Sequence, residues 1–486
     1  MKKTILIFIL LIAAWFVHAQ TIPDNWQGLY DTLEKKLLSI DSALTKNWNG
    51  QKYCTNYCSN LLPAGSNKGE ELLTQLPGLY SVNKYLEALD PIGVTAIDLT
   101  IQYPILVNSF PRSGEYLDYY IKVSRLIKSS GKKLLIGCQS TFRDSVFGRL
   151  NVDSFYTGLN TQRYKTEKLQ MMQTIIDSLQ PDYLTIEMEP GTQEMNLGLD
   201  FSVDSCMSYI DFFMAGLDKK NSLIGAGTGT WDDMKYIDTI VKRPDIDYID
   251  YHIYPVNKDF FVDKIFTIDS LAKQYSKKLI IGECWLHKAS DYDLETKGYL
   301  ELFSRDVFSF WTPLDSLFIE SIVKLSHYSK IEVTSLFWSN LFFSYVNHTP
   351  AHDSVSPGLL FSEAFSAAGP NIISKTFTAT GQLYHDLIID ACDTINSIVT
   401  PFDKNENFLI NLYPNPSGGK IFLTANSPDC YNYVITVLSA SGNILQQKKL
   451  QHHAEEFDLS GYSNGIYYLK LQTPEYSNSV KVVIIK

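Results

Sequence analysis

The sequence of 486 residues lacks the motifs of several common enzyme classes. It contains no His-Glu-x-x-His, no EF-hand loop and no paired Cys/His spacing, so it predicts no metal site. It also contains no Walker loop, and no Gly-x-Gly-x-x-Gly opens a helix after the first strand, which disfavours a nucleotide-binding enzyme. The absence of a Gly-x-Ser-x-Gly elbow disfavours an esterase. We therefore expect no cofactor.

Cysteine and positive charge are both scarce. The seven cysteines are too few and too scattered for a fold held together by disulfides. Cys54 and Cys58 form the one close pair. Their spacing is equally compatible with a local disulfide and with two free thiols. The 42 Lys and Arg residues against 53 Asp and Glu give a formal net charge of −11, which argues against nucleic acid as a partner.

Long apolar runs are confined to the start of the chain. Lys2 and Lys3 precede an apolar stretch that ends in Val17-His18-Ala19. This is the pattern of a secretory signal peptide, and we expect residues 1–19 to be one, with cleavage after Ala19. No later stretch approaches about 18 uninterrupted apolar residues, so we expect no transmembrane segment in the mature chain.

Strand-like and helix-like segments alternate through most of the chain. This alternation predicts a parallel sheet covered by helices on both faces. The strand-like runs lie near residues 51–62, 94–101, 133–138, 183–189, 223–227, 248–254, 279–283 and 333–338. Eight such runs predict an α/β fold of the (β/α)₈ (TIM barrel) type over residues 20–398, with an open doubly wound sheet as the competing fold. An amphipathic helix is also expected near residues 29–44.

The pattern changes near Pro401. Short alternating runs between turns predict a small β-sandwich over residues 408–486, joined to the barrel by a linker at residues 399–407. Tyr413-Pro-Asn-Pro416, Gly465-Ile-Tyr467 and the last strand Lys481–Lys486 resemble the C-terminal sorting domain of the type IX secretion system. The resemblance implies the type IX machinery as a partner, and a secreted or outer-surface location on a Gram-negative bacterium. A generic carbohydrate-binding sandwich is the alternative.

Two glutamates stand where strand-like runs end. Glu189 ends the run at residues 183–189, and Glu283 ends the run at residues 279–283. In a parallel barrel such positions face the pocket that the βα loops build. Enzymes that hydrolyse glycosidic bonds usually use a pair of carboxylates. Strand alternation places Glu187 on the same inward face as Glu189, and Met188 on the outward face.

A resemblance to a known group of enzymes follows from the strand count, which puts Glu189 on strand four and Glu283 on strand seven. Met188-Glu189-Pro190 resembles the Asn-Glu-Pro of the large (β/α)₈ clan of retaining glycoside hydrolases. Tyr251–Pro255 resembles the clan's His/Tyr element on strand six, and Gly282–Trp285 its nucleophile strand. Within the clan, the pattern is nearest to the endo-β-1,4-galactanase group. Met188 stands where the clan has an Asn that contacts the sugar.

This resemblance implies a role for each matched residue. Glu189 would be the acid/base and Glu283 the nucleophile. Tyr254 would hydrogen-bond Glu283, and His252 would line the same sugar subsite. Trp338 would be a platform for a sugar ring. The remaining expected substrate-binding residues come from strand ends, without support from the resemblance; they are Gln139, Trp285 and Asp98.

Two functions are compatible with these residues. The first is a secreted retaining glycoside hydrolase that cleaves a poly- or oligosaccharide by double displacement. The second is a catalytically inactive barrel, displayed at the surface to bind glycan. Carboxylates that face each other across an open cleft favour the enzyme, whereas a filled cleft or a carboxylate paired with Lys or Arg favours the binding protein. We expect the helices of residues 286–336 to wall the cleft.

Overall fold

The structure is a computed structural model of the whole chain. It describes residues 20–76, 79–143, 149–254, 261–389, 410–413, 417–425, 434–439, 443–449, 454–472, 477–484 and 486. The chain divides into two compact units, Met1–Ala391 and Cys392–Lys486. The predicted signal peptide and the predicted linker lie outside the described residues.

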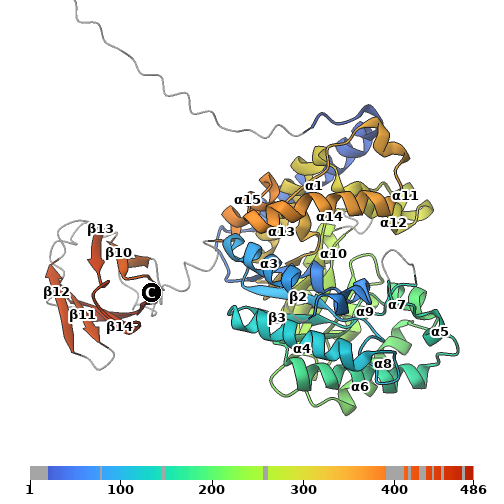
Figure 1. Cartoon of the computed structure of the whole chain (residues 1–486), viewed down its shortest axis with the longest axis horizontal. Coiled ribbons are helices and arrows are strands. Elements are labelled where there is room, and N and C mark those ends of the chain that lie inside the picture. The colour runs from blue at the N-terminus through green and yellow to red at the C-terminus, as the bar shows by residue number, and fades with distance from the viewer. Residues whose placement is uncertain are drawn as a thin grey trace, which may run out of the picture. The chain divides into compact units, whose positions relative to one another are not determined.

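Eight parallel strands form a closed barrel in the first unit, in sequence order. Figure 1 shows this unit, coloured along the chain. They are β1 (Asn56–Asn60), β2 (Ala96–Thr100), β3 (Lys133–Gly137), β4 (Tyr183–Glu187), β5 (Leu223–Gly229), β6 (Tyr248–His252), β7 (Lys278–Cys284) and β8 (Val333–Leu336). Each strand pairs with its neighbour in the chain, and β1 pairs with β8 to close the ring. The predicted (β/α)₈ fold is confirmed, and the open sheet is not formed.

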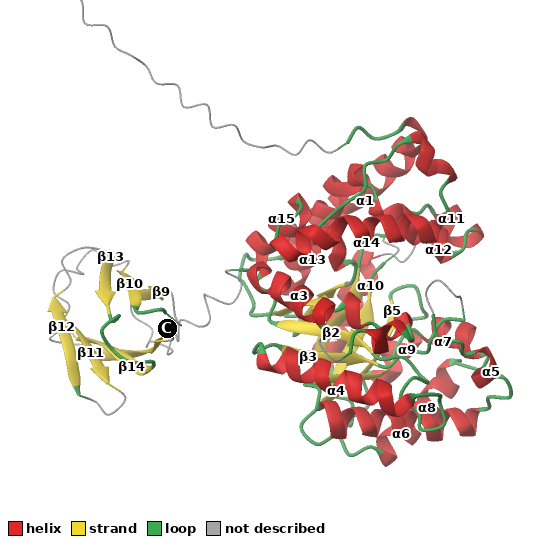
Figure 2. Ribbon diagram, viewed as in Figure 1, coloured by secondary structure: helices red, strands yellow, loops and turns green. Residues whose placement is uncertain are grey.

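Helices surround the barrel (Figure 2). In chain order they are α1 (Asp24–Asn47), α2 (Glu71–Thr74), α3 (Tyr80–Leu89), α4 (Ser113–Ser129), α5 (Asp153–Tyr156), α6 (Thr161–Leu179), α7 (Pro190–Leu197), α8 (Val203–Gly216), α9 (Lys235–Ile240), α10 (Phe261–Gln274), α11 (Asp291–Thr296), α12 (Tyr299–Ser304), α13 (Thr312–Tyr328), α14 (Pro357–Ser374) and α15 (Ala379–Ile388). The predicted N-terminal helix is α1. It buries Leu33, Leu37, Ile40 and Leu44, whose spacing of three or four residues forms one stripe, and it packs against α13.

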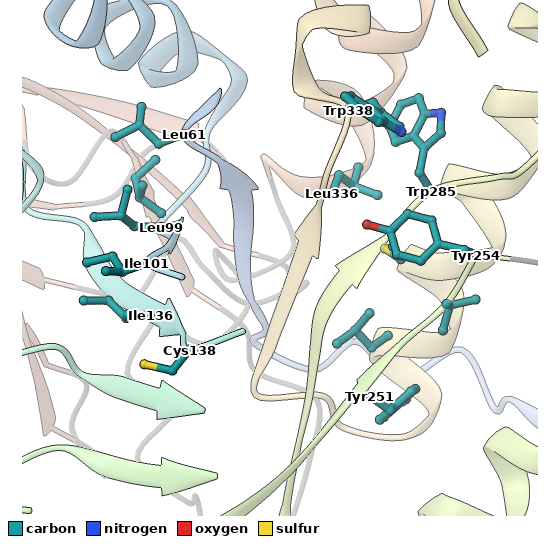
Figure 3. Close-up of a cluster of buried hydrophobic side chains, with 14 of the residues drawn as sticks. Leu61, Leu99, Ile101, Ile136, Cys138, Tyr251, Tyr254, Trp285, Leu336 and Trp338 are labelled. Atoms are coloured by element: carbon teal, nitrogen blue, oxygen red, sulfur yellow. The ribbon is translucent and has the colours of Figure 1, made fainter. Parts of the chain in front are cut away.

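Strand alternation separates two apolar layers. Inward-facing side chains, such as Leu135, Tyr248 and Ile280, fill the barrel interior. Outward-facing side chains pack beneath the helices, and Figure 3 shows part of that layer. There Leu99 of β2 and Ile136 of β3 are register partners on adjacent strands. Two-sided burial explains why the strands are nearly continuous apolar runs.

The end of β4 departs from simple alternation. The pairing of β4 with β5 shifts register between Thr185 and Glu187. Glu187 therefore leaves the inward face, and its carboxylate lies 2.8 Å from Lys168 on α6. Met188 turns inward instead, against the position where a Cβ on Gly137 would lie. The expected inward Glu187 and outward Met188 are both wrong, because a β-bulge inserts one residue and reverses the faces.

The C-terminal unit consists of two antiparallel sheets, ordered β13-β10-β9 and β12-β11-β14-β15. The strands are β9 (Ile410–Tyr413), β10 (Lys420–Ala425), β11 (Val434–Ser439), β12 (Ile444–Lys449), β13 (Ala454–Asp458), β14 (Gly465–Gln472) and β15 (Ser477–Ile484). Ile421 and Phe457 of the first sheet share one core with Val437, Leu469 and Val482 of the second. This arrangement is the predicted small sandwich.

The close cysteine pair does not form a local disulfide. Cys58 is a free, buried thiol on β1. Cys54 is disulfide-bonded, but not to Cys58. Because Cys58 lies on the inward face of β1 among the residues of the barrel interior, its sulfur is not available to a neighbour in the preceding loop.

Candidate active site

Glu189 lies just beyond β4, in an unusual backbone conformation. Its φ of 47° and ψ of 64° place it in the left-handed region, which a non-glycine residue rarely occupies. Pro190 then begins α7 with the fixed φ that suits a first helical position. After the bulge has turned Glu187 outward, this backbone turn returns the next carboxylate, that of Glu189, to the barrel mouth.

Glu283 lies near the end of β7, three strands further round the barrel. Oxygen atoms of Glu189 and Glu283 and a ring nitrogen of His252 all lie within 4.8 Å of one another. All three side chains are buried, with the two glutamates 6% and 8% exposed. The structure thus brings together the two strand-end glutamates that the sequence singled out.

Hydrogen bonds hold both carboxylates in place. The Tyr254 hydroxyl donates to Oε2 of Glu283 at 2.9 Å, which is the contact expected from the resemblance. Nδ1 of His252 lies 2.5 Å from Oε1 of Glu189 and 3.9 Å from Oε2 of Glu283. Asp250 lies behind His252, with Oδ2 3.8 Å from Nε2.

Asp250 belongs to the floor of the site. Its carboxylate accepts hydrogen bonds from the Thr185 hydroxyl at 2.7 Å and from the Gly282 backbone N–H at 2.8 Å. A side chain at residue 282 would collide with this carboxylate, since a Cβ there would lie 2.5 Å from Oδ1. Glycine at this position therefore allows Asp250 to reach β7 and to stand behind His252.

Burial and charge set the protonation of the pair. Burial raises the pKa of Glu283 to about 8, although the positive charge of His252 opposes the shift. Burial alone would lower the pKa of His252, but the carboxylates of Glu283 and Glu189 outweigh it and raise that pKa well above 6.5. At neutral pH these shifts place a proton on Glu283 and a positive charge on His252.

The same three groups are close enough together to ligate a metal ion. However, an imidazolium ring holds a proton on each nitrogen and has no lone pair to offer a cation. With its pKa raised, His252 carries a second proton in this arrangement, which a cation would have to displace.

A cavity of about 940 Å³ opens over the carboxylates. Five of the residues expected at the site line it; they are Glu189, Glu283, Tyr254, Trp338 and Gln139. Its walls are rich in aromatic rings, which can cover the apolar face of a sugar. The predicted wall from residues 286–336 is present, because residues of α11 and α12 line the cavity; they are Leu294, Tyr299, Leu302 and Phe303.

Three predicted substrate contacts do not line the cavity. His252 lies beneath Glu189 and is 1% exposed, so it contacts the carboxylates rather than the subsite. Asp98 is buried on β2, where it accepts a hydrogen bond from Asn60 at 2.6 Å. Trp285 is fully buried, and its ring packs on Phe342; Figure 3 shows it among the buried hydrophobic side chains. For Trp285 and Asp98 the position at a strand end is right, but the side chain is enclosed by protein.

Several lining residues are not among the expected substrate-binding residues. His287 stacks on Tyr254 with ring centroids 4.7 Å apart, and Trp231 lies 6.0 Å from the same ring. Phe142 and Phe361 also line the cavity. These residues lie in loops or in helices beyond the strands, and an aromatic residue in a loop carries no periodic signal. Proximity to a strand end was the one available signal, and it applies to Trp231 and His287.

The sequence of the C-terminal unit matches a known domain family. Residues 411–486 match the family of secretion system C-terminal sorting domains. The tail is a sorting domain. It indicates export by the type IX system to the cell surface or the surroundings, and hence an interaction with that machinery. Within the described residues, none of the helices has the length and apolar character needed to cross a membrane.

No curated protein matches the sequence. Among solved structures, a GH30 endoxylanase from Clostridium papyrosolvens is 12% identical, with a TM-score of 0.38 over 84% of this chain and 95% of that chain. A double mutant of the Cellulomonas fimi endo-β-1,4-mannanase is 10% identical, with a TM-score of 0.35 over 93% and 98%. A GH5 subfamily 18 variant from Bifidobacterium longum, in complex with Manβ1-4GlcNAc, is 10% identical, with a TM-score of 0.46 over 69% and 78%. The strand order and register, and not these likenesses, define the barrel.

Proposed function

We propose that the protein is an exported retaining glycoside hydrolase that acts on a poly- or oligosaccharide. Glu189 is the acid/base and Glu283 is the nucleophile. The observation that carries the proposal is the approach of the two buried carboxylates to within 4.8 Å beneath an aromatic-lined cavity. A retaining enzyme needs its carboxyl groups only about 5–5.5 Å apart, whereas an inverting enzyme needs room for water between them.

The charges around the pair favour an enzyme over an inactive glycan-binding barrel. Among the described residues, neither Glu189 nor Glu283 forms an ion pair with Lys or Arg. The cavity above them is also unfilled by side chains over about 940 Å³. Met188 points toward Gly137 and not into the cavity, so the sugar contact of the clan's Asn is supplied by another residue or is missing.

In the proposed reaction, the pair shares one proton. Glu189 donates it to the departing oxygen while Glu283 attacks the anomeric carbon, and Glu189 then takes a proton from the water that releases the sugar. The reactive form therefore has Glu283 ionised and Glu189 protonated. Because burial raises the pKa of Glu283 to about 8, ionising this carboxylate costs free energy at neutral pH.

Hydrolysis with a stereochemical readout tests the proposal. The secreted protein is incubated with β-1,4-linked galactan, mannan, xylan and glucan and with aryl β-glycosides. The variant Glu189→Gln/Glu283→Gln serves as the control for contaminating hydrolases. We expect release of sugar with the anomeric configuration retained, measured by NMR at early times. Inverted product would contradict the double displacement, and glycan binding without hydrolysis would support the inactive barrel.

The pH profile should have an alkaline limb set by the shared proton. Glu283 has a folded-state pKa of about 8, so the pair keeps its proton below this pH and loses it above. We therefore expect kcat/KM to be flat just below about pH 8 and to fall roughly tenfold per unit above it. A profile that is still rising at pH 9 would contradict a required proton on this pair.

Tyr254→Phe should lower kcat/KM on the pH-independent plateau and should shift the pH at which kcat/KM begins to fall. The hydroxyl of Tyr254 stabilises the ionised form of Glu283, and a hydrogen bond to a charged group contributes about 1.5–3 kcal/mol. Its loss makes the reactive form rarer by roughly 10- to 100-fold and raises the pKa of Glu283. We expect kcat/KM to fall by that factor and the alkaline limb to shift upward. An unchanged plateau with a shifted limb would indicate that Glu283 acts as the proton donor instead.

A further inference from the structure

Three side chains from separate segments that follow barrel strands meet above the candidate active site. Phe142 follows β3, Met195 lies on α7 after β4, and Tyr299 begins α12 after β7. The ring centroids of Tyr299 and Phe142 lie 6.0 Å apart with the planes at 63°. The Tyr299 hydroxyl contacts the Met195 sulfur. We refer to Phe142, Met195 and Tyr299 as the mouth bridge.

The strand order shows that the mouth bridge extends across the mouth of the barrel. In a closed barrel of eight strands in sequence order, β3 and β7 lie on opposite sides. The loops after these strands emerge at the same end of the barrel. Contact between Phe142 and Tyr299 therefore spans the mouth. All three bridge residues line the cavity that contains Glu189 and Glu283.

The segment that carries Tyr299 is fixed at its base by buried charges. Lys288, in the loop after β7, is fully buried and ion-paired with Asp315 of α13. Arg305, at the end of α12, lies 3.2 Å from Asp293 of α11. Removing one partner of a buried ion pair is strongly unfavourable. These pairs therefore hold α11 and α12 against the barrel and keep Tyr299 at the mouth.

A continuous aromatic wall runs from the mouth bridge down to the catalytic pair. The Tyr299 ring stacks on Phe303 with centroids 6.3 Å apart, and Phe303 lies 4.7 Å from His287. His287 in turn stacks on Tyr254, which donates to Glu283. The bridge is therefore part of the wall of the same site, and its position is tied to that of the nucleophile.

We propose that the mouth bridge restricts the site to the free ends of glycan chains. This inference rests on the proposed function. An internal stretch of a polymer enters an active site by being laid into an open groove, and side chains that cross the groove prevent this. A chain end can pass beneath them. A cavity of about 940 Å³ falls in the range that holds a small ligand, and so suits a short terminal segment.

The chemical consequence concerns the products. Hydrolysis beneath the bridge releases small sugars from one end of the chain, in the exo manner. This differs from the endo action that the nearest group in the sequence resemblance would suggest. Phe142 and Tyr299 are then residues that determine specificity for chain ends, whereas Glu189 and Glu283 carry out the bond cleavage.

Viscometry combined with a reducing-sugar assay tests this inference. The full chain, Phe142→Ala/Tyr299→Ala and the control Tyr292→Ala are compared on the soluble polysaccharide that the panel above shows to be hydrolysed fastest. Tyr292 lies on α11 and is 72% exposed, so its loss tests the effect of removing a surface ring nearby. Circular dichroism and thermal unfolding check that each variant is folded.

We expect the full chain and Tyr292→Ala to release reducing sugar with little loss of viscosity. At the same extent of hydrolysis, the bridge variant should lower the viscosity at least severalfold more, because internal segments can now enter. A full chain that lowers viscosity as steeply as the bridge variant would overturn the restriction and leave the proposed function intact. Absence of hydrolysis by all three proteins on the whole panel would instead overturn the proposed function, and this inference with it.

Discussion

Replacing Glu283 with Ala should reduce turnover on the order of 10⁴-fold or more, because the variant has no carboxylate to form the covalent intermediate. Small anions can then occupy the space that the carboxylate leaves. Added azide should restore turnover and give a glycosyl azide of inverted configuration, since azide attacks from the side where Glu283 stood. The measurement is NMR identification of the azide product, together with kcat at increasing azide concentration.

Glu189→Ala should behave differently, because a missing acid matters most when the leaving group is poor. Loss of general acid–base catalysis costs roughly 10²–10⁴-fold. We expect that loss on unactivated glycosides and a much smaller one on aryl glycosides with acidic phenols, which leave without protonation. Azide should now attack the glycosyl-enzyme and give a product of retained configuration.

The matched control is Glu194→Ala. Glu194 lies on α7, five residues after Glu189, but its side chain is exposed and does not line the cavity. We expect its kinetics to equal those of the unmodified protein. If azide gave inverted product with Glu189→Ala and retained product with Glu283→Ala, the two roles would have to be exchanged. The raised pKa of Glu283 makes this exchange the most informative outcome to look for.

The barrel and the two glutamates were predictable from the sequence because their signals are local. A strand buried on both faces has to be a short apolar run, and a glutamate that ends such a run has to lie at the mouth. Glu283 lies on its strand, whereas Glu189 lies just beyond its strand and reaches the mouth through a backbone turn. The tail was predictable for a similar reason, since its turns and alternating strands follow one another closely in the chain.

The bulge at β4 and the walls of the cavity were not predictable, because long-range packing decides them. Alternation alone places Glu187 inside the barrel, and only the pairing of β4 with β5 and the presence of Lys168 on α6 turn it outward. Likewise, Phe142 and Tyr299 lie 157 residues apart in sequence, and they meet only because β3 and β7 face each other in the closed ring.

Replacing Lys168 with Met should strongly destabilise the barrel. Lys168 is fully buried, and its ammonium lies 2.8 Å from the Glu187 carboxylate and 2.8 Å from the Tyr164 hydroxyl, which itself donates to Glu187. Breaking a buried ion pair leaves an uncompensated charge and costs about 3–5 kcal/mol. We expect the free energy of unfolding, measured by urea denaturation at pH 8, to fall by about that amount.

The pH dependence of this loss identifies its cause. Burial already raises the pKa of Glu187 above 4.5, and without Lys168 its pKa must rise further. A carboxyl with a raised folded-state pKa binds its proton more tightly in the folded than in the unfolded state. The stability of the variant should therefore fall as pH rises above about 4.5, so that its deficit is smaller at pH 5 than at pH 8.

A double variant separates lost charge compensation from lost packing. Lys168→Met/Glu187→Gln removes the unpaired carboxylate, keeps the volume of both side chains and preserves a hydrogen-bonding group for Tyr164. It should recover most of the stability that Lys168→Met loses, with little dependence on pH. An equal loss of unfolding free energy in both variants would mean that Lys168 stabilises the barrel through packing of its aliphatic chain. Glu187 lies two residues before Glu189, so its contact with Lys168 can also hold the bulge that places the acid/base at the mouth. If it does, the double variant should recover activity together with stability.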